Sequence, residues 1–364
     1  MAKIDAFLKL GREQGCSDIH LAVGVPPMLR MNGELMPIKF RNLGDTELES
    51  YVNEILTDLQ RQRFEDGEDL DFAYSAEDIG RFRVNLYRKL TGVGVTVRHI
   101  PEDVPQWEAL GLPPLVEDLS WYHQGLVLVT GSTGTGKSTT LAAIIDLINQ
   151  RDRRNVITLE DPIEFVHRSR QCQVVQRELG THVPDFARGL RAALREDPDV
   201  ILVGELRDPE TIALAMTAAE TGHLVLATLH TTSAVKTIDR IIDAMPPEQH
   251  EQIKLFLTQH LRAVISQQLV RTPDGRGRKA IVETMVMTHA IANLLTQNKT
   301  FQIPNQMRSG RAHGMLLMDQ ALLAAVQNKE VDPDDAYLHA SDRKQFQRFV
   351  VDSSLLPKVD LAGS

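Results

Sequence analysis

The sequence predicts a two-domain α/β protein in which a smaller α+β domain precedes a larger domain built on a mostly parallel sheet. Its 364 residues, of which 42% are hydrophobic, exceed what one core usually organises and suggest about two domains. Prolines crowd residues 101–114, and proline continues neither a helix nor a central strand. Beyond them, apolar strands alternate with helices, which is typical of a parallel sheet covered on both faces. We therefore expect an N-terminal domain over 1–100, a linker over 101–115, a second domain with a C-terminal helical part over 116–352, and a flexible tail over 353–364.

The N-terminal domain combines short helices with strands of alternating character. Gly15 is expected to end its first helix, and Thr46 is expected to cap a longer amphipathic one. The acidic residues from Glu65 to Asp71 predict a solvated loop. The expected elements are helices over 5–14 and 46–64 and strands over 19–23, 28–37, 81–88 and 94–100.

The second domain shows short apolar runs of strand length, separated by helical patterns. The expected strands are 126–130, 156–159, 200–203 and 224–228, and the expected helices are 137–150, 185–195, 209–221, 243–268 and 333–349.

Composition and charge exclude several classes of protein. No run of 18 or more apolar residues occurs, which argues against a membrane span, and the first residues contain no apolar core of a signal peptide. Cys16 and Cys172 form no Cys-x-x-Cys pair, so neither a disulfide scaffold nor a zinc site is expected. This cysteine content is typical of a protein in the reducing cytoplasm. Acidic residues outnumber basic ones 49 to 40, which disfavours a general binder of nucleic acid.

A phosphate-binding loop is predicted between the strand 126–130 and the helix that follows it. The pattern is glycine, four residues, then Gly-Lys-Ser, and its position after a strand and before a helix supports the assignment. The glycines let backbone amides converge on phosphate oxygens, and the helix N-terminus adds a partial positive charge. Lys137 would reach the β- and γ-phosphates, and Ser138 would offer its hydroxyl to Mg²⁺. The expected nucleotide-binding residues are Gly131, Ser132, Thr133, Gly134, Thr135, Gly136, Lys137, Ser138 and Thr139.

Acidic residues and a histidine follow three of the predicted strands. Glu205 comes after the apolar run 200–203 and one glycine, which is the Walker B form with Glu in place of the commoner Asp. Glu160 ends a second apolar run, and His230 follows a third; His223, at the other end of that run, is the weaker candidate. In open parallel sheets ligands bind outside the carboxyl ends of the strands. We therefore expect these side chains to face the nucleotide, with Ser138 and Glu205 as metal ligands.

Taken together, these motifs resemble the type IV pilus and type II secretion motor ATPases, and within them the retraction (twitching-motility) branch, PilT and PilU. The resemblance extends over about residues 17–349. It rests on the P-loop and on the segments 15–21, 157–165, 197–208, 221–231, 267–270 and 314–320.

The resemblance implies an N-terminal PAS-like domain, a RecA-like ATPase core and a homo-hexameric ring with ATP and Mg²⁺ as cofactors. It implies that Glu160 is the general base, that Glu205 is the Walker B carboxylate and that His230 lies near the γ-phosphate. Arg83 and Arg98 match the arginines that such motors direct from the N-terminal domain toward the nucleotide. The implied partners are an inner-membrane pilus platform protein and a paralogous motor ATPase, without nucleic acid, at the cytoplasmic face of the inner membrane.

The sequence departs from the retraction branch at one position. Where that branch often reads Ala-Ile-Arg-Asn-Leu, this chain has Ala292 in place of the arginine. The change removes a charge-assisted contact, either within the ring or to a partner, or reflects a helix that packs differently.

The expected function is an ATP-hydrolysing hexameric motor for type IV pilus retraction. Three alternatives stay open: a pilus-assembly or type II secretion ATPase, a nucleic-acid translocase or P-loop kinase, and an accessory paralogue of the main motor. The assembly relatives usually carry a four-cysteine zinc insertion, which two distant cysteines cannot supply. A translocase would need a binding platform, and 5% aromatic residues in an acidic chain provide no evident one.

Overall fold

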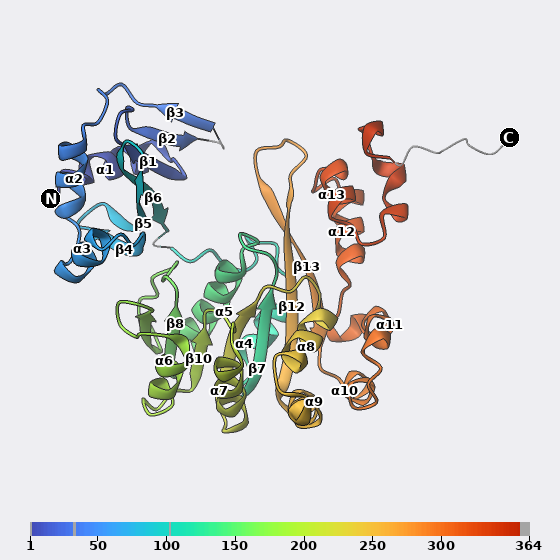
Figure 1. The fold of residues 1–364 in the computed structure, drawn as a ribbon. Helices are drawn as coiled ribbons and strands as arrows, with labels where there is room; N and C mark the ends of the chain where they lie inside the picture. The colour runs from blue at the N-terminus through green and yellow to red at the C-terminus, as the bar shows by residue number, and fades with distance from the viewer. Residues whose placement is uncertain (1, 32–33, 102, 357–364) are drawn as a thin grey trace. The chain divides into compact units, whose positions relative to one another are not determined.

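The computed structural model describes residues 2–31, 34–101 and 103–356 (Figure 1). The chain forms two compact units, one of Met1–Asp103 with Pro162–Val166 and the other of Val104–Asp161 with His167–Ser364. Each unit has its own sheet and its own hydrophobic core. Within the described ranges, no helix combines the length and the apolar character that crossing a membrane requires.

The first unit is a six-stranded sheet in the order β3-β2-β1-β6-β5-β4, in which every neighbouring pair is antiparallel. One face carries Ile19, Leu21, Phe82 and Val84 into the core, where Leu8 of the first helix is also buried. The elements are α1 (Asp5–Gln14), β1 (Asp18–Ala22), β2 (Met28–Met31), β3 (Glu34–Pro37), α2 (Asp45–Asn53), α3 (Asp58–Glu65), β4 (Leu70–Ala76), β5 (Gly80–Lys89) and β6 (Gly92–Ile100).

Four sequence predictions for this unit are wrong in detail. The helix expected over 46–64 is two helices, because Thr57 starts a new one: its Oγ1 accepts from Gln60 N, and Gln60 Oε1 accepts from Thr57 N. Gly44, rather than Thr46, is the N-cap of α2. The strand expected over 28–37 is a pair, β2 and β3, and the acidic loop ends early because Leu70 and Asp71 begin β4.

The second unit contains a seven-stranded sheet in the order β13-β12-β7-β11-β10-β8-β9 (Figure 1). Five neighbouring pairs are parallel, and only the pair of β12 and β13 at one edge is antiparallel. The predicted mostly parallel sheet is therefore confirmed. The strands are β7 (Gly125–Thr130), β8 (Asn155–Glu160), β9 (Gln173–Glu178), β10 (Val200–Val203), β11 (Leu224–Leu229), β12 (Leu261–Arg271) and β13 (Arg278–Val286).

Helices cover both faces of this sheet. α4 and α5 pack on one face against a cluster that includes Val127, Val156 and Leu224, whereas α6, α7, α8 and α9 pack on the other with Leu128 and Val225. Burial on both faces explains why β7 and β11 read as continuous apolar runs. The helices are α4 (Leu115–Ser120), α5 (Lys137–Arg151), α6 (Phe186–Ala193), α7 (Pro209–Glu220), α8 (Ala234–Asp243), α9 (His250–His260), α10 (His289–Thr296), α11 (Ile303–Ser309), α12 (Met318–Gln327) and α13 (Pro333–His339).

The prediction of a helical stretch over 243–268 is wrong at its end. α9 stops at His260, and Leu261 begins β12, which pairs with β7 on one side and with β13 on the other. The residues Ala263, Val264 and Ile265 are buried without alternation, and such a run cannot be assigned to helix or strand from periodicity. Strands β9 and β13 were not predicted at all.

The C-terminal part is less helical than predicted. α13 ends at His339, and the carboxylate of Asp319 accepts from the backbone N–H groups of Ser341 and Asp342 at 2.9 and 2.8 Å. These bonds hold an extended break in the helix predicted over 333–349, which continues only as short 3-10 turns at Arg343–Gln345 and Gln347–Phe349. The predicted tail begins with a 3-10 turn at Ser353–Leu355, and its residues 357–364 lie outside the described residues. The segment expected as a linker contributes Leu112 and Leu115 to the core of the second unit.

Candidate nucleotide site

The predicted phosphate-binding loop lies between β7 and α5, at the carboxyl end of the parallel strands. Its glycines adopt positive φ values, among them 145° at Gly131 and 85° at Gly136. A Cβ atom on Gly131 would lie 2.4 Å from the carbonyl oxygen of Gln267 and 2.6 Å from Thr135 Oγ1. The loop can therefore close this tightly only with glycine at that position.

Lys137 is the first residue of α5 and folds back over the loop. Its Nζ donates to the carbonyl oxygens of Gly131 at 2.9 Å and Ser132 at 3.0 Å, and the residue is only 8% exposed. Ser138 and Thr139 follow in the first turn of α5 and are partly exposed, while Ser132, Thr133 and Gly134 are exposed. The ammonium group is thus held beside the exposed rim of the loop, where an anion would meet it together with the helix N-terminus.

Gln267 of β12 supports the loop from behind, and sequence reasoning assigned it no role. Its Oε1 accepts from Thr140 Oγ1 at 2.8 Å, and a Cβ on Gly136 would lie 2.9 Å from its Nε2. One residue earlier, Ser266 Oγ is hydrogen-bonded to Thr130 Oγ1 at 2.8 Å. Both contacts are buried, so β12 fixes the end of β7 and the start of α5.

Glu205 and His230 are brought together at the same edge of the sheet. Val203 of β10 lies opposite Leu159 of β8 and Ala227 of β11, so the three strands end side by side. His230 Nε2 lies 3.0 Å from Glu205 Oε1, and Arg207 Nε donates to Glu205 Oε2 at 2.7 Å. The Glu205 side chain is 16% exposed, so two basic groups hold a carboxylate that keeps access to solvent.

Arg207 also reaches the acidic segment after β8, since its Nη1 lies 3.8 Å from Asp161 Oδ2. His223, the weaker candidate, lies apart from this group. It precedes β11 at the amino end of the sheet, and its Nδ1 lies 2.9 Å from the carbonyl oxygen of Ala218.

Glu160 is the last residue of β8, and two neighbours hold its carboxylate. Thr158 Oγ1 donates to Glu160 Oε1 at 2.7 Å, and Gln176 Nε2 donates to the same oxygen at 3.0 Å. Gln176 lies on β9 directly opposite Thr158, and its Oε1 accepts from the backbone N–H of His167 at 2.8 Å. That bond fixes which end of the Gln176 amide faces Glu160. Sequence reasoning missed Gln176 because it missed the whole of β9.

Replacing Gln176 with leucine should lower kcat for ATP hydrolysis by about 10-fold to 100-fold, because the carboxylate of Glu160 loses a donor that orients it. KM for ATP should change little, since the Gln176 amide binds Glu160 and the backbone of His167. Steady-state kinetics of Gln176→Leu, with Gln173→Leu at the start of the same strand as control, measure both quantities. A rise in KM at unchanged kcat would contradict this role.

His167, whose backbone N–H binds Gln176, has a buried imidazole with a lowered pKa. Burial lowers the pKa of its imidazole to about 4 from an ordinary 6.5, and its buried Nδ1 is without a partner in the described structure. The neutral ring is therefore favoured in the folded chain, and its contribution to stability is complete above pH 6.5 and is lost as the pH falls toward 4. The loss amounts to up to roughly 2–3 kcal/mol.

We expect the His167→Gln protein to show a flatter fall of the thermal unfolding midpoint between pH 6.5 and 4 than the unchanged chain. Parallel unfolding curves at several pH values for both proteins measure this. Identical slopes would show that His167 does not titrate in this range.

Arg83 and Arg98 lie in the first unit and directly face each other across β5 and β6. Arg83 binds Asp71 through two nitrogens, with Nη2 at 2.6 Å and Nε at 3.0 Å, and Arg98 Nε donates to Asp18 at 2.8 Å. Their face of the sheet is the one opposite the apolar core, because their neighbours Phe82, Val84 and Val97 are buried on the other side. The two predicted arginines thus lie side by side within their own unit, and each is ion-paired with an aspartate.

The donor set at the sheet edge suits a magnesium ion that a nucleotide brings with it. Ser138 and Glu205 would supply hard oxygen ligands of the kind that Mg²⁺ prefers, beside phosphate oxygens and water. No group of three or more His, Cys, Asp or Glu that could hold a metal occurs among the described residues. A metal bound by one or two protein oxygens plus phosphates needs no such group.

A parallel sheet with helices on both faces and a glycine loop that encloses a buried lysine define the second unit as a RecA-like P-loop ATPase domain. Residues 13–355 match the model of the family described as type II/IV secretion system protein, and the chain belongs to that family.

Within this family, the chain is similar to named pilus ATPases and to one solved structure. The chain is 44% identical to the type IV pilus retraction ATPase PilT of Pseudomonas aeruginosa, over 92% of this chain and 96% of that protein. It is 37% identical to the type IV pilus ATPase PilU of the same organism, over 96% of this chain and 91% of that protein. It also resembles the crystal structure of the pilus retraction motor PilT with bound ADP, with a TM-score of 0.89 and 40% identity over 96% of this chain and 99% of that one.

Proposed function

We propose that this chain is an ATP-hydrolysing motor that powers type IV pilus retraction and hence twitching motility. The observation that carries the proposal is the 44% identity to a pilus retraction ATPase over nearly the full length of both chains. The complete P-loop, with Lys137 held over it, supports hydrolysis by this chain rather than a passive role. The similarity to a retraction motor with bound ADP supports ATP as the nucleotide.

The site residues have distinct roles in this proposal. The P-loop amides and Lys137 bind the phosphates, and Ser138 and Glu205 hold Mg²⁺, which supplies charge neutralisation at the γ-phosphate when it is bound. Glu160 activates the attacking water, and His230 orients the carboxylate of Glu205, which it contacts. Arg83 and Arg98 add positive charge at the γ-phosphate.

The working form in this proposal is a homo-hexamer at the cytoplasmic face of the inner membrane. Its partners are the pilus platform protein and a paralogous motor ATPase. Retraction is favoured over assembly because the named relative that matches at 44% is a retraction ATPase and because two distant cysteines cannot form the zinc site of assembly motors. The similarity to PilU and the residue Ala292 make an accessory motor the second candidate.

Complementation of a strain that lacks its retraction motor tests the proposal. The chain should restore twitching and reduce an excess of surface pili, while its Lys137→Ala variant should do neither. Deletion of the chain from its own host separates the alternatives. Loss of pili would indicate an assembly motor, and normal twitching with normal pili would indicate an accessory one.

A further inference from the structure

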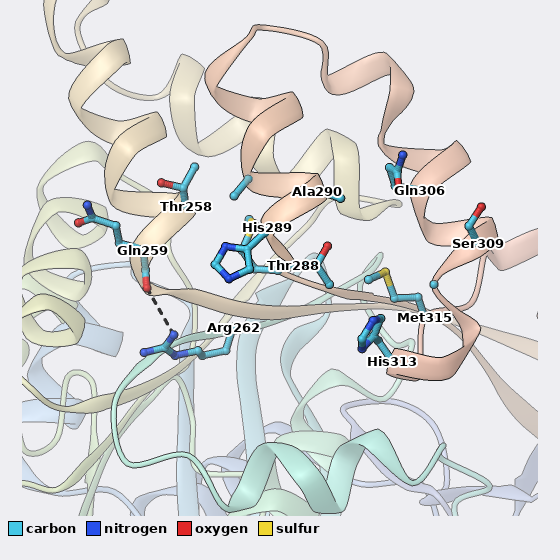
Figure 2. Close-up of a pocket in the computed structure, with 13 residues that line it drawn as sticks. Thr258, Gln259, Arg262, Thr288, His289, Ala290, Gln306, Ser309, His313 and Met315 are labelled. Carbon is cyan, nitrogen blue, oxygen red and sulfur yellow. Dashed lines mark hydrogen bonds between the residues drawn. The ribbon is translucent and has the colours of Figure 1, made fainter.

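A cavity in the ATPase domain lies at the amino end of the parallel strands, whereas the P-loop lies at their carboxyl end. Its volume is about 980 Å³, and the end of α9, the start of β12, α10, α11 and the 3-10 turn Arg311–His313 surround it (Figure 2). β12 begins at Leu261, which lies opposite Leu126 near the start of β7, whereas the P-loop follows the last residue of β7. The length of the sheet therefore separates the cavity from the candidate nucleotide site.

The lining of this cavity carries one permanent positive charge, that of Arg262, and no negative one. Acidic residues outnumber basic ones 49 to 40 in the sequence, yet the lining contains no aspartate and no glutamate. Arg262 enters from β12, His289 from α10 and His313 from the 3-10 turn, so three separate elements bring basic side chains to one hollow (Figure 2). Such a convergence of basic groups without a compensating acid favours an anionic ligand.

Arg262 is fixed at the cavity by the backbone around it. Its Nε donates to the carbonyl oxygen of Gln124 at 3.0 Å, and its Nη1 donates to that of Gln259 at 3.4 Å (Figure 2). These bonds use only part of the N–H donors of a guanidinium, which can still bind a carboxylate. A pre-positioned arginine loses little side-chain entropy when it binds.

The rest of the lining suits a peptide better than a single small ion. Thr288, Ser309 and Gln306 offer hydrogen-bonding side chains, while Met287 and Met315 offer apolar surface. A volume of about 980 Å³ also exceeds what one carboxylate or phosphate fills. We propose that this cavity binds an acidic segment of a partner protein, whose carboxylates contact Arg262, His289 and His313. This site is separate from nucleotide binding and does not depend on hydrolysis.

Ala292 provides a direct test because it lines the cavity and lies on α10. Arginine, glutamine and glutamate are all good helix formers, so each variant should keep the helix while its charge at the cavity differs. One unit charge at short range in a partly solvated site changes Kd roughly tenfold, which corresponds to about 1.4 kcal/mol. Ala292→Arg should tighten binding of an acidic peptide about tenfold, Ala292→Glu should weaken it about tenfold, and Ala292→Gln is the matched neutral control.

The measurement is fluorescence anisotropy of a labelled hexaglutamate peptide with the full chain, in saturating ADP and Mg²⁺ so that the P-loop is occupied. Hexaglutamine is the neutral control peptide. If a variant at position 292 fails to fold, the same three substitutions are made at Ala290, which also lines the cavity. The same affinity in the Arg, Gln and Glu variants would overturn the proposal, as would equal binding of hexaglutamine. Displacement of the peptide by millimolar inorganic phosphate alone would instead make the site one for small anions and would also overturn it.

The Lys137→Ala protein separates this inference from the proposed function. It should bind hexaglutamate as the unchanged chain does, because Lys137 is not among the lining residues. If the unchanged chain binds the peptide but hydrolyses no ATP, the proposed function is contradicted and the acidic-peptide site stands.

Discussion

Replacement of Lys137 by alanine is expected to abolish ATP turnover while the chain stays folded. The ammonium group is held beside the rim of the P-loop by two carbonyl oxygens, and this is the position from which it would meet the β- and γ-phosphates. Removal of a single pre-positioned donor to developing charge typically costs about 10²–10³ in kcat. We expect a loss of at least that size, measured as phosphate release at saturating ATP and Mg²⁺.

The fold should tolerate this change. Lys137 donates to the carbonyl oxygens of Gly131 and Ser132, and exposed Ser132 can bind water in its place. The unfolding midpoint of Lys137→Ala should therefore stay within a few degrees of that of the unchanged chain. Lys299→Ala, at an exposed position of the same unit, is the control. Normal turnover in a purified Lys137→Ala protein would show that the P-loop is not the site of ATP hydrolysis.

Sequence alone could locate the P-loop because all of its determinants are contiguous. The glycines, Lys137 and Ser138 lie within eight residues, and the buried strand before them is recognisable as a single apolar run. Sequence alone could also locate Glu160, Glu205 and His230, because each lies at or just after the end of a recognisable apolar strand. Parallel pairing then places the ends of those strands at one edge without further information.

The supporting residues could not be found in this way, because their roles depend on pairing between distant segments. Gln267 touches the P-loop only because β12 lies next to β7, and the sequence pattern assigned that segment to a helix. Gln176 reaches Glu160 from β9, whose polar residues show no run or alternation that indicates a strand. Contacts of this kind are set by register, which one sequence does not display.

The arginine pair illustrates the same limit in the first unit. The resemblance named Arg83 and Arg98 separately, but it did not show that they lie opposite each other. That relation follows from the register of β5 and β6, which pairs Lys89 with Gly92 next to the turn between the strands. Their carboxylate partners, Asp71 and Asp18, come from two further strands and were not expected either.

Arg98→Gln is expected to lower kcat by about 10³-fold or more, which is the range that an arginine at the γ-phosphate contributes in other phosphoryl-transfer enzymes. The Arg98 side chain is 65% exposed and contacts Asp18 through Nε. Arg83, in contrast, would have to exchange a two-nitrogen contact with Asp71 for one with phosphate. We therefore expect a smaller loss of kcat for Arg83→Gln. Affinity for ADP, which lacks the γ-phosphate, should stay within a few-fold in both variants, and Arg41→Gln is the control at an exposed, ion-paired arginine of the same unit.

A loss of turnover in Arg98→Gln could also arise from the fold, because Asp18 is only 6% exposed and would lose its ion pair at 2.8 Å, keeping Arg30 Nε at 3.9 Å and the Ser17 hydroxyl. The double variant Asp18→Asn with Arg98→Gln separates the two causes, since it also removes the buried negative charge that Arg98 neutralises. If Arg98 acts on the γ-phosphate, the double variant stays inactive, whereas Asp18→Asn alone keeps most of its turnover. If Arg98 only neutralises Asp18, the double variant regains activity. Recovery of kcat in the double variant would therefore show that Arg98 stabilises the fold and does not act on the γ-phosphate.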